Sequence, residues 1–251
     1  MGITKKSPDR QSPVAALVVA ALLIWGLQRF VPYGRLVLYP FTLLSTWVHE
    51  MGHGLTALFL GGRFARLDIY ADASGLAYSY VLPGARGALV AAGGLLAPPF
   101  VGMLMLMFGR RAARPLLMGL ATAMVVSLAL WVRTPIGWLT VGGLAGLCVV
   151  VSHLVSAGGR LFFTQLLGLL LALDTVMRAD YLFMSSAQIG GRVHASDVAG
   201  ITSAVGGPQA LWGGLIAALS AGLLLVGLWS VLSAGRGSAE PAPGGRATSN
   251  I

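Results

Sequence analysis

Two histidines and a glutamate have the clearest chemical potential in this sequence, in His49-Glu50-Met51-Gly52-His53, which fits the pattern H-E-x-x-H. On a helix, positions i and i+4 share a face, so both imidazoles can reach one Zn²⁺ ion. Glu50 can then contact a water molecule on the metal and act as general base. The spacing predicts a zinc site with His49 and His53 as ligands and Glu50 as the catalytic residue.

The surroundings of this motif strengthen the zinc hypothesis. The motif lies in a mainly apolar segment, residues 36–60. Ionisable groups at bilayer depth are costly, so three of them close together indicate a shared function. The alternative is a set of polar residues that hydrogen-bond between helices in the core of a bundle.

Catalytic zinc takes three protein ligands and a water molecule, so the motif needs a third side chain. The candidates are the other acidic residues and histidines between residues 61 and 208, namely Asp68, Asp72, Asp174, Asp180, Asp197, His153 and His194. Asp174 alone is enclosed by apolar sequence on both sides, and a cation beside it removes the cost of burying its charge. We therefore predict Asp174 as the third ligand. A protonated carboxyl group bonded to a neighbouring helix is the alternative.

Three of the other candidates have simpler interpretations. His153, near the end of an apolar segment, is typical of a hydrogen-bonded interfacial histidine. Asp180 can pair with Arg178 at the membrane edge. Ser196-Asp197 is typical of a helix N-cap, although Asp197 can also reach the site from a loop.

The composition predicts a multi-pass membrane protein. Only 10% of the 251 residues are charged and 56% are hydrophobic, whereas soluble domains carry about 25% charged residues. The single cysteine, Cys148, excludes an intramolecular disulfide and a multi-thiolate metal site. The net charge of +9 suits contact with anionic lipid headgroups. The scarcity of exposed polar segments argues against a nucleic-acid partner.

The apolar segments predict an all-α protein with about seven transmembrane helices, each needing about 20 apolar residues. They lie near residues 13–31, 36–60, 88–108, 114–132, 136–155, 161–178 and 209–233. The second contains several polar residues and is expected inside the bundle. Gly93-Gly94 and Pro98-Pro99 indicate that the third is kinked or closely packed, with neighbouring groups bonding its freed backbone.

The remaining segments are shorter and more polar. Residues 63–82 contain two partly alternating runs separated by an Asp/Ser/Gly turn, which predicts a β-hairpin at the membrane surface. Residues 1–12 form a polar N-terminal tail, and residues 234–251 form a flexible Gly/Ser/Pro/Ala tail. One membrane-embedded domain is therefore expected over residues 13–233, with residues 179–208 as a polar connection.

These motifs together resemble the site-2-protease superfamily of intramembrane zinc metallopeptidases, and most closely its compact bacterial branch without a PDZ domain. The resemblance is carried by the H-E-x-x-H motif at 49–53, Gly61-Gly62-Arg63, Ser74-Gly75, Leu173-Asp174-Thr175 and the segment from Ser196 to Trp212. It implies Asp174 as third ligand by position, although this chain has Asp174-Thr175 where the family has Asp-Gly. It also implies a location in the bacterial cell membrane.

The sequence therefore predicts a zinc-dependent endopeptidase that cleaves a membrane protein or membrane peptide in or beside the lipid bilayer. One alternative is a non-proteolytic, zinc-stabilised membrane scaffold, which would tolerate loss of Glu50 but not of His49 and His53. A transporter with a buried His/Asp cation path is disfavoured, because no internal repeat is apparent. The sequence leaves membrane orientation and oligomeric state open.

Overall fold

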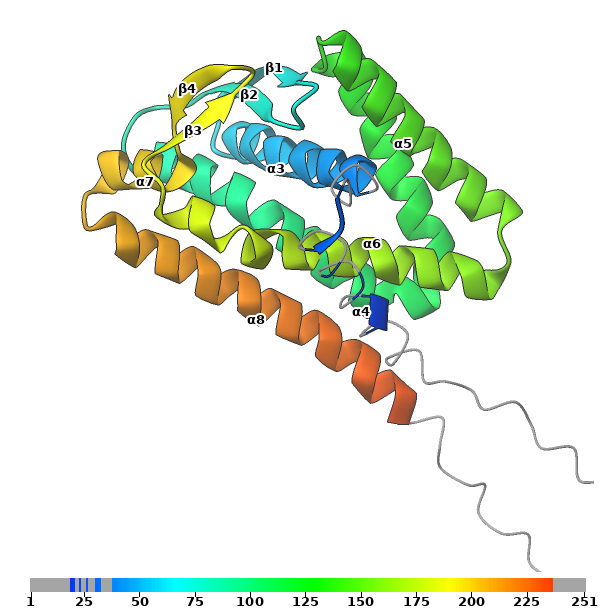
Figure 1. Cartoon of the computed structure of the whole chain (residues 1–251). Coiled ribbons are helices and arrows are strands. Elements are labelled where there is room, and N and C mark those ends of the chain that lie inside the picture. The colour runs from blue at the N-terminus through cyan, green and yellow to red at the C-terminus, as the bar shows by residue number, and fades with distance from the viewer. Residues whose placement is uncertain (1–18, 21–22, 24–25, 27–29, 33–37, 237–251) are drawn as a thin grey trace, which may run out of the picture.

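The computed structural model describes residues 19–20, 23, 26, 30–32 and 38–236 and shows a mainly helical protein with two small hairpins (Figure 1). In chain order the elements are α3 (Tyr39–Phe59), β1 (Arg63–Ile69), β2 (Gly75–Tyr80), α4 (Ala85–Leu130), α5 (Pro135–Leu154), α6 (Ala157–Met177), η1 (Ala179–Phe183), β3 (Ser186–Ile189), β4 (Arg192–Ala195), α7 (Asp197–Val205) and α8 (Gln209–Arg236). The predicted tail 1–12 and most of the predicted helix 13–31 lie outside the described residues. Of the predicted tail 234–251, only residues 234–236 are described, as the end of α8.

Four of the described helices are long and apolar enough to cross a membrane: α4, α5, α6 and α8. The predicted count of about seven spans is not confirmed. Two of the expected spans, 88–108 and 114–132, form the single 46-residue helix α4. The expected span 36–60 forms α3, which is not among the four because its Ser, Thr, His and Glu residues lower its hydropathy.

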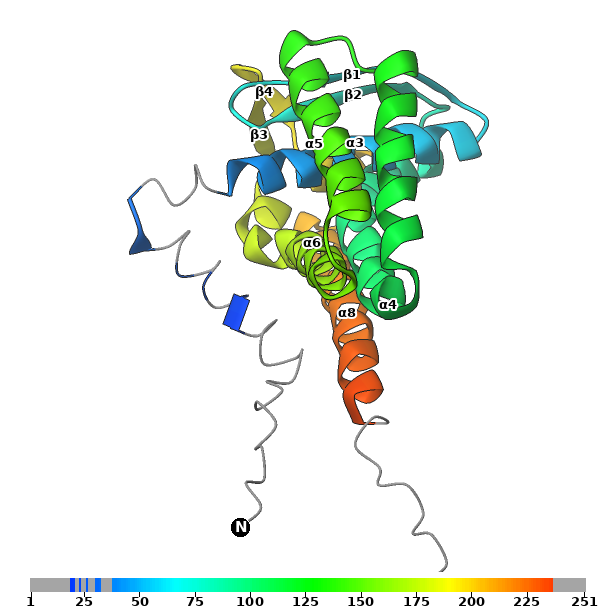
Figure 2. The ribbon, with the colours of Figure 1, turned by 90° about the vertical axis from the view of Figure 1, so that its right-hand side faces the viewer.

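Helix α4 contains a sharp break at Ala112, where the backbone angles are φ −138° and ψ 30°. The break comes just before Pro115, which therefore lies in the first turn of the second arm. Proline is tolerated there, because a first-turn residue has no intrahelical carbonyl to bond. Figure 2 shows the consequence: the first arm runs past α6, and the second turns up alongside α5. The break explains why two predicted spans appear as one element without a loop.

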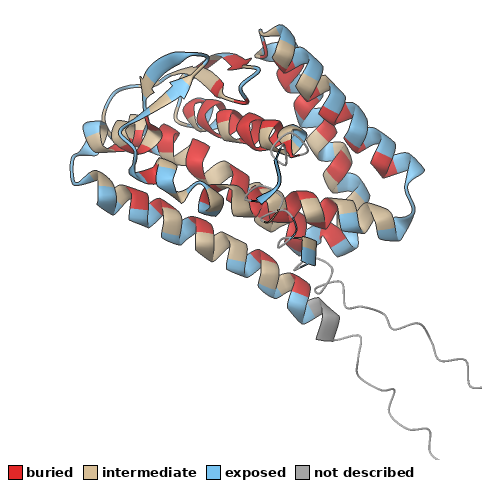
Figure 3. Ribbon diagram, in the orientation of Figure 1, coloured by how far each residue is buried: buried red, intermediate tan, exposed pale blue. Residues whose placement is uncertain are grey.

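Helix α3 lies in the middle of the molecule, and most of its residues are buried (Figure 3). Its close contact with α4 depends on small residues. A β-carbon on Gly52 would stand 2.5 Å from the carbonyl oxygen of Gly93, and one on Gly94 would stand 2.2 Å from the His53 ring. The predictions that this helix lies inside the bundle and that Gly93-Gly94 mark close packing are both confirmed.

The carbonyl group that Pro99 leaves without a donor is bonded by a neighbouring helix, as predicted. Proline has no N–H group, so Pro99 cannot donate to the carbonyl oxygen of Leu95 one turn earlier. The hydroxyl of Thr175 on α6 donates to that oxygen instead, at 3.3 Å. This bond fixes the last turn of α6 against α4.

The predicted hairpin at 63–82 is confirmed: β1 and β2 pair antiparallel, with a bulge between Phe64 and Arg66. A second hairpin, β3–β4, lies within the segment expected to be a polar connection. Its turn is Gly190-Gly191, and both glycines have the positive φ that a two-residue hairpin turn requires. The backbone N–H of Gly190 donates to the Ser74 hydroxyl at 3.0 Å, which links the two hairpins.

Candidate metal centre

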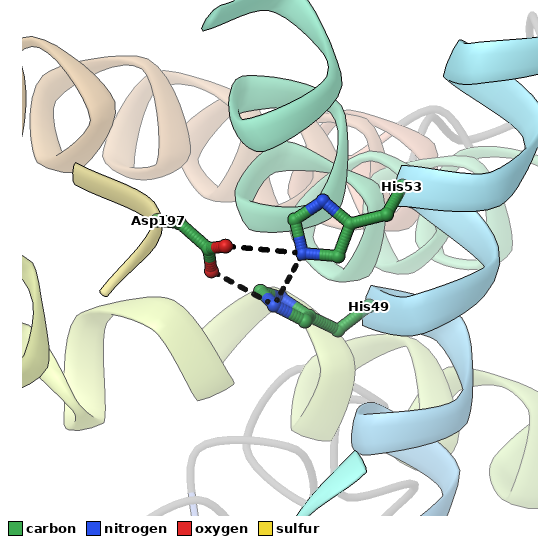
Figure 4. A group of neighbouring side chains, drawn as sticks. All are labelled: His49, His53 and Asp197. Atoms are coloured by element: carbon green, nitrogen blue, oxygen red, sulfur yellow. Dashed lines mark hydrogen bonds and ion pairs between the residues drawn. The ribbon is translucent and has the colours of Figure 1, made fainter. Parts of the chain in front are cut away.

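His49 and His53 project from one face of α3 toward the first turn of α7, where they meet Asp197 (Figure 4). The Nε2 atoms of the two imidazoles are 3.1 Å apart. Asp197 Oδ2 lies 3.1 Å from His49 Nε2, and Asp197 Oδ1 lies 3.3 Å from His53 Nε2. Within the described part of the chain, this is the one group of three or more such side chains whose ligand atoms converge, all within 4.8 Å of one another.

These spacings fit a tetrahedral metal ion. Ligands at about 2.0–2.1 Å from zinc in tetrahedral geometry stand roughly 3.3 Å from one another. The three observed separations, 3.1, 3.1 and 3.3 Å, are close to that value. Two imidazole nitrogens and a carboxylate oxygen are also the donor types that zinc accepts. The donor set therefore fits Zn²⁺.

The tautomer of His53 is fixed by the backbone of α4. Its Nδ1 lies 2.8 Å from the carbonyl oxygen of Val90. A carbonyl oxygen only accepts hydrogen bonds, so Nδ1 carries the proton and donates. In the neutral imidazole, Nε2 then presents its lone pair to a metal, as ligating histidines commonly do.

Asp197 is placed by the start of α7 and by η1. Ser196 is the N-cap of α7, and its hydroxyl accepts from the backbone N–H of Ala199 at 3.1 Å. The phenol of Tyr181 on η1 donates to Asp197 Oδ2 at 3.1 Å. Burial and the charge of Asp197 raise the pKa of Tyr181, so the phenol keeps its proton. The carboxylate is thus oriented from two neighbouring elements.

The electrostatics of Asp197 favour its charged form. Burial alone would raise the pKa of this carboxyl group. Without a metal, a protonated His53 supplies a positive charge, and this charge together with hydrogen bonds from both histidines outweighs burial and holds the pKa of Asp197 well below its usual range. Asp197 therefore presents a carboxylate, which is the form that binds a metal.

Glu50 is buried between α3 and β2 beside the two histidines. Its Oε2 accepts a hydrogen bond from the backbone N–H of Ala77 at 2.7 Å. The approach is close, because a β-carbon on Gly75 would stand 2.7 Å from Glu50 Cγ. Glu50 is not part of the converging ligand group. The role of Glu50 as the catalytic base stays a prediction.

Glu50 and His49 open into a cavity of about 450 Å³. Its walls come from α3, the β1–β2 turn, the end of α6, η1 and β3, and include Thr46, Gly75, Asp174, Tyr181 and Ile189. The volume lies within the range of small-ligand pockets. A small ligand can therefore be accommodated beside Glu50 and His49.

The structure differs from the predicted ligand set at Asp174. This residue lines the cavity but is not part of the converging group; its Oδ1 lies 3.2 Å from Arg178 Nε, four residues along. The cation beside Asp174 is therefore Arg178, one helical turn further along, and not the predicted zinc ion. Asp197, considered in the sequence mainly as part of an N-cap, stands beside the histidines instead. The geometry favours Asp197 over Asp174 as third ligand.

The other candidates lie away from the two histidines or make separate contacts. Asp68 is buried and pairs with Arg66, and Asp72 accepts from Ser74 within the β1–β2 turn. His153 accepts a hydrogen bond from Arg114. Asp180 is exposed at the cavity, and His194 lies on β4. Neither Tyr181 nor the β3–β4 hairpin is predicted from the sequence patterns above, although Gly190-Gly191 is a signal for the turn of that hairpin.

A helical bundle with four candidate spans and an H-E-x-x-H helix facing a carboxylate defines a membrane protein of the metallopeptidase class. A family model described as Peptidase M50B-like matches residues 14–227, and the chain belongs to this family. This is the site-2-protease family, so the resemblance read from the motifs is confirmed. No curated protein and no solved structure matches the chain. The family and the four apolar helices together indicate an integral membrane protein.

Proposed function

We propose that this protein is a zinc-dependent endopeptidase that hydrolyses peptide bonds in or beside the membrane. His49, His53 and Asp197 bind one Zn²⁺ ion, and Glu50 is the catalytic base. The observation that carries the proposal is that ligand atoms of His49, His53 and Asp197 all lie within 4.8 Å of one another. Glu50, the residue after His49, is buried and lines the adjoining cavity. Family membership supports the same reaction class.

The chain's own groups supply the proton transfers. Zn²⁺, when bound, is a Lewis acid that polarises a carbonyl group and lowers the pKa of water. The Glu50 carboxylate takes a proton from the attacking water as the new C–O bond forms. It then donates that proton to the amide nitrogen as the C–N bond breaks, which leaves a carboxylic acid and an amine, and the acid passes its proton to the amine to give a carboxylate and an ammonium group.

The β1–β2 hairpin is a candidate for holding the substrate. A transmembrane helix must unwind before its carbonyl groups can be attacked, and an extended segment can pair with a free strand edge. Within the described ranges β2 pairs with β1 alone, and the N–H of Ala77 on its other edge donates to Glu50. A substrate segment on that edge would lie beside the catalytic base. The simpler role for the hairpin is a membrane-surface anchor.

The proposed substrate is a membrane protein or membrane peptide, and the proposed location is the bacterial cell membrane. The family supports a peptide substrate, the four candidate spans support a membrane location, and the bacterial cell membrane is what the resemblance to the compact bacterial branch implies. A non-proteolytic scaffold keeps the same metal but needs no base. Glu50 therefore separates the two functions.

The test uses the full chain in bacterial membrane vesicles, with zinc content and new protein N-termini measured by mass spectrometry. Glu50→Gln should retain its zinc yet lose the N-termini that the wild type generates, with at least a ~100-fold fall in rate. Glu240→Gln, at the one other glutamate of the chain, is the matched control and should behave like wild type. Zinc-loaded wild type that generates no N-termini beyond those of Glu50→Gln would exclude proteolysis and support the scaffold.

A further inference from the structure

Four arginines gather at the corner where α4 breaks and α5 leads into α6. Arg110, Arg111 and Arg114 surround the break at Ala112, and Arg160 lies in the first turn of α6. We call these four residues the arginine corner. Arg114 is joined to the end of α5 by the hydrogen bond that its Nη2 donates to Nδ1 of His153, at 3.2 Å. Arg160 Nη1 donates to the carbonyl oxygen of Ser152 at 3.0 Å, which fixes it on the last turn of α5.

Among the residues that the structure describes, the arginine corner has no acidic partner to balance it. Residues 81–173, which include all of α4 and α5 and most of α6, contain no Asp or Glu. Among the described residues, the four ion pairs all lie elsewhere, and no interaction is found for Arg110 or Arg111. The nearest acid along α6 is Asp174, 14 residues after Arg160, or about 21 Å along a helix. Uncompensated like charges repel, so an external anion is expected to lower the free energy of this corner.

The corner is also expected at the depth where lipid headgroups are found, because it lies where two candidate spans end. Both α5 and α6 are candidate spans, and they meet here, α5 ending at Leu154 and α6 beginning at Ala157. The end of a spanning helix reaches the headgroup region. Large apolar side chains are exposed around the arginines: Phe108 at 44%, Leu154 at 80% and Phe162 at 44%. The surface therefore combines guanidinium groups for a phosphate with apolar side chains for an acyl chain.

We propose that the arginine corner is a binding site for the phosphate of an anionic phospholipid headgroup. Guanidinium groups match phosphate oxygens in geometry as well as charge. The exposed apolar side chains favour a lipid over a free phosphate ion, because a free ion gains nothing from them. The site is separate from the metal centre, and its occupancy stabilises the junction of α4, α5 and α6.

The test compares two triple variants of the full chain in detergent micelles. Arg110→Gln/Arg111→Gln/Arg114→Gln removes the site. Arg63→Gln/Arg86→Gln/Arg192→Gln removes the same charge from exposed arginines elsewhere and is the matched control. Phosphatidylglycerol, phosphatidylcholine or inorganic phosphate is added to each. Lipid retention is measured by native mass spectrometry and the unfolding midpoint by thermal denaturation.

Phosphatidylglycerol should bind wild type and the control, raise their unfolding midpoints, and bind the corner variant roughly 100-fold more weakly, as expected for three lost arginine contacts. Phosphatidylcholine should have little effect on any of the three. Equal weakening in both triple variants would show general electrostatic attraction and overturn the site. An equal midpoint shift with inorganic phosphate would overturn a lipid as the ligand. Circular dichroism of the corner variant without lipid should match wild type, which excludes misfolding as the cause.

Discussion

The end of α6 and the start of α7 each bring an aspartate near α3, yet the two carboxylates differ in their partners. Asp174 pairs with Arg178 on its own helix, 3.2 Å away. Asp197 meets two histidines from a helix almost 150 residues earlier in the chain and accepts from Tyr181 as well. The comparison shows that a carboxylate in apolar sequence need not be a ligand, because a local cation can neutralise it.

The largest expected difference between the two regions is in metal affinity. Asp197→Ala should weaken zinc binding more than roughly 100-fold, beyond the range seen for residues that only orient ligands. Competition with a chelator of known affinity measures the loss. Asp174→Ala should bind zinc like wild type in the same assay. The opposite result, with Asp174 needed and Asp197 dispensable, would restore the ligand set that the sequence predicts.

Tyr181 allows a second test of the difference between the two aspartates, because its phenol donates a hydrogen bond to Asp197 and not to Asp174. Tyr181→Phe removes the hydrogen bond to Asp197 Oδ2 but keeps the ring that packs on the cavity wall. Zinc affinity should fall roughly 10-fold to 100-fold, since such outer contacts orient a ligand. Tyr39→Phe removes a phenol bonded to the backbone of Ala71 and is the control. If Tyr181→Phe keeps full affinity, Asp197 is held by α7 alone.

A substitution at the end of α6 is expected to lower the free energy of unfolding without changing zinc affinity. Thr175→Val leaves the carbonyl oxygen of Leu95 without its donor while keeping the volume of the side chain. The free energy of unfolding should fall by about 1–3 kcal/mol, the cost of an unsatisfied buried polar group. Denaturant unfolding in micelles measures it. Zinc affinity of the refolded variant should equal that of wild type, and a lower affinity would mean that α6 also positions the metal ligands.

The smallest effect is expected for the Asp174–Arg178 pair itself. Both side chains are partly exposed, at 23% and 48%. Exposed pairs contribute about 0–1 kcal/mol, so Asp174→Asn should change the free energy of unfolding by no more than that. Arg178→Gln should have the same small effect. A much larger loss for Asp174→Asn alone would indicate a second partner for this carboxylate.

The sequence predicted the elements whose signals are local. The H-E-x-x-H spacing placed His49, Glu50 and His53 on one helix, and the polar residues around them predicted a buried α3. Alternating runs with a Ser74-Gly75 turn predicted the β1–β2 hairpin. Gly93-Gly94 predicted that this part of α4 is kinked or closely packed, and it packs closely against α3. Each of these patterns is set by neighbouring residues, whose geometry is fixed by the period of a helix or strand.

Other features depend on contacts between distant segments, and only the tertiary structure decided them. Whether α4 is one helix or two spans depends on a break at a single residue, Ala112, whose backbone angles no composition encodes. The third ligand depends on which aspartate folds back to α3. Asp174 has the stronger local signal, but Arg178 lies one helical turn away, whereas η1 and the β3–β4 hairpin carry Asp197 to the histidines. The ligands of a metal site must lie close together in space. Sequence spacing predicts such distances within one helix but not between residues on different elements.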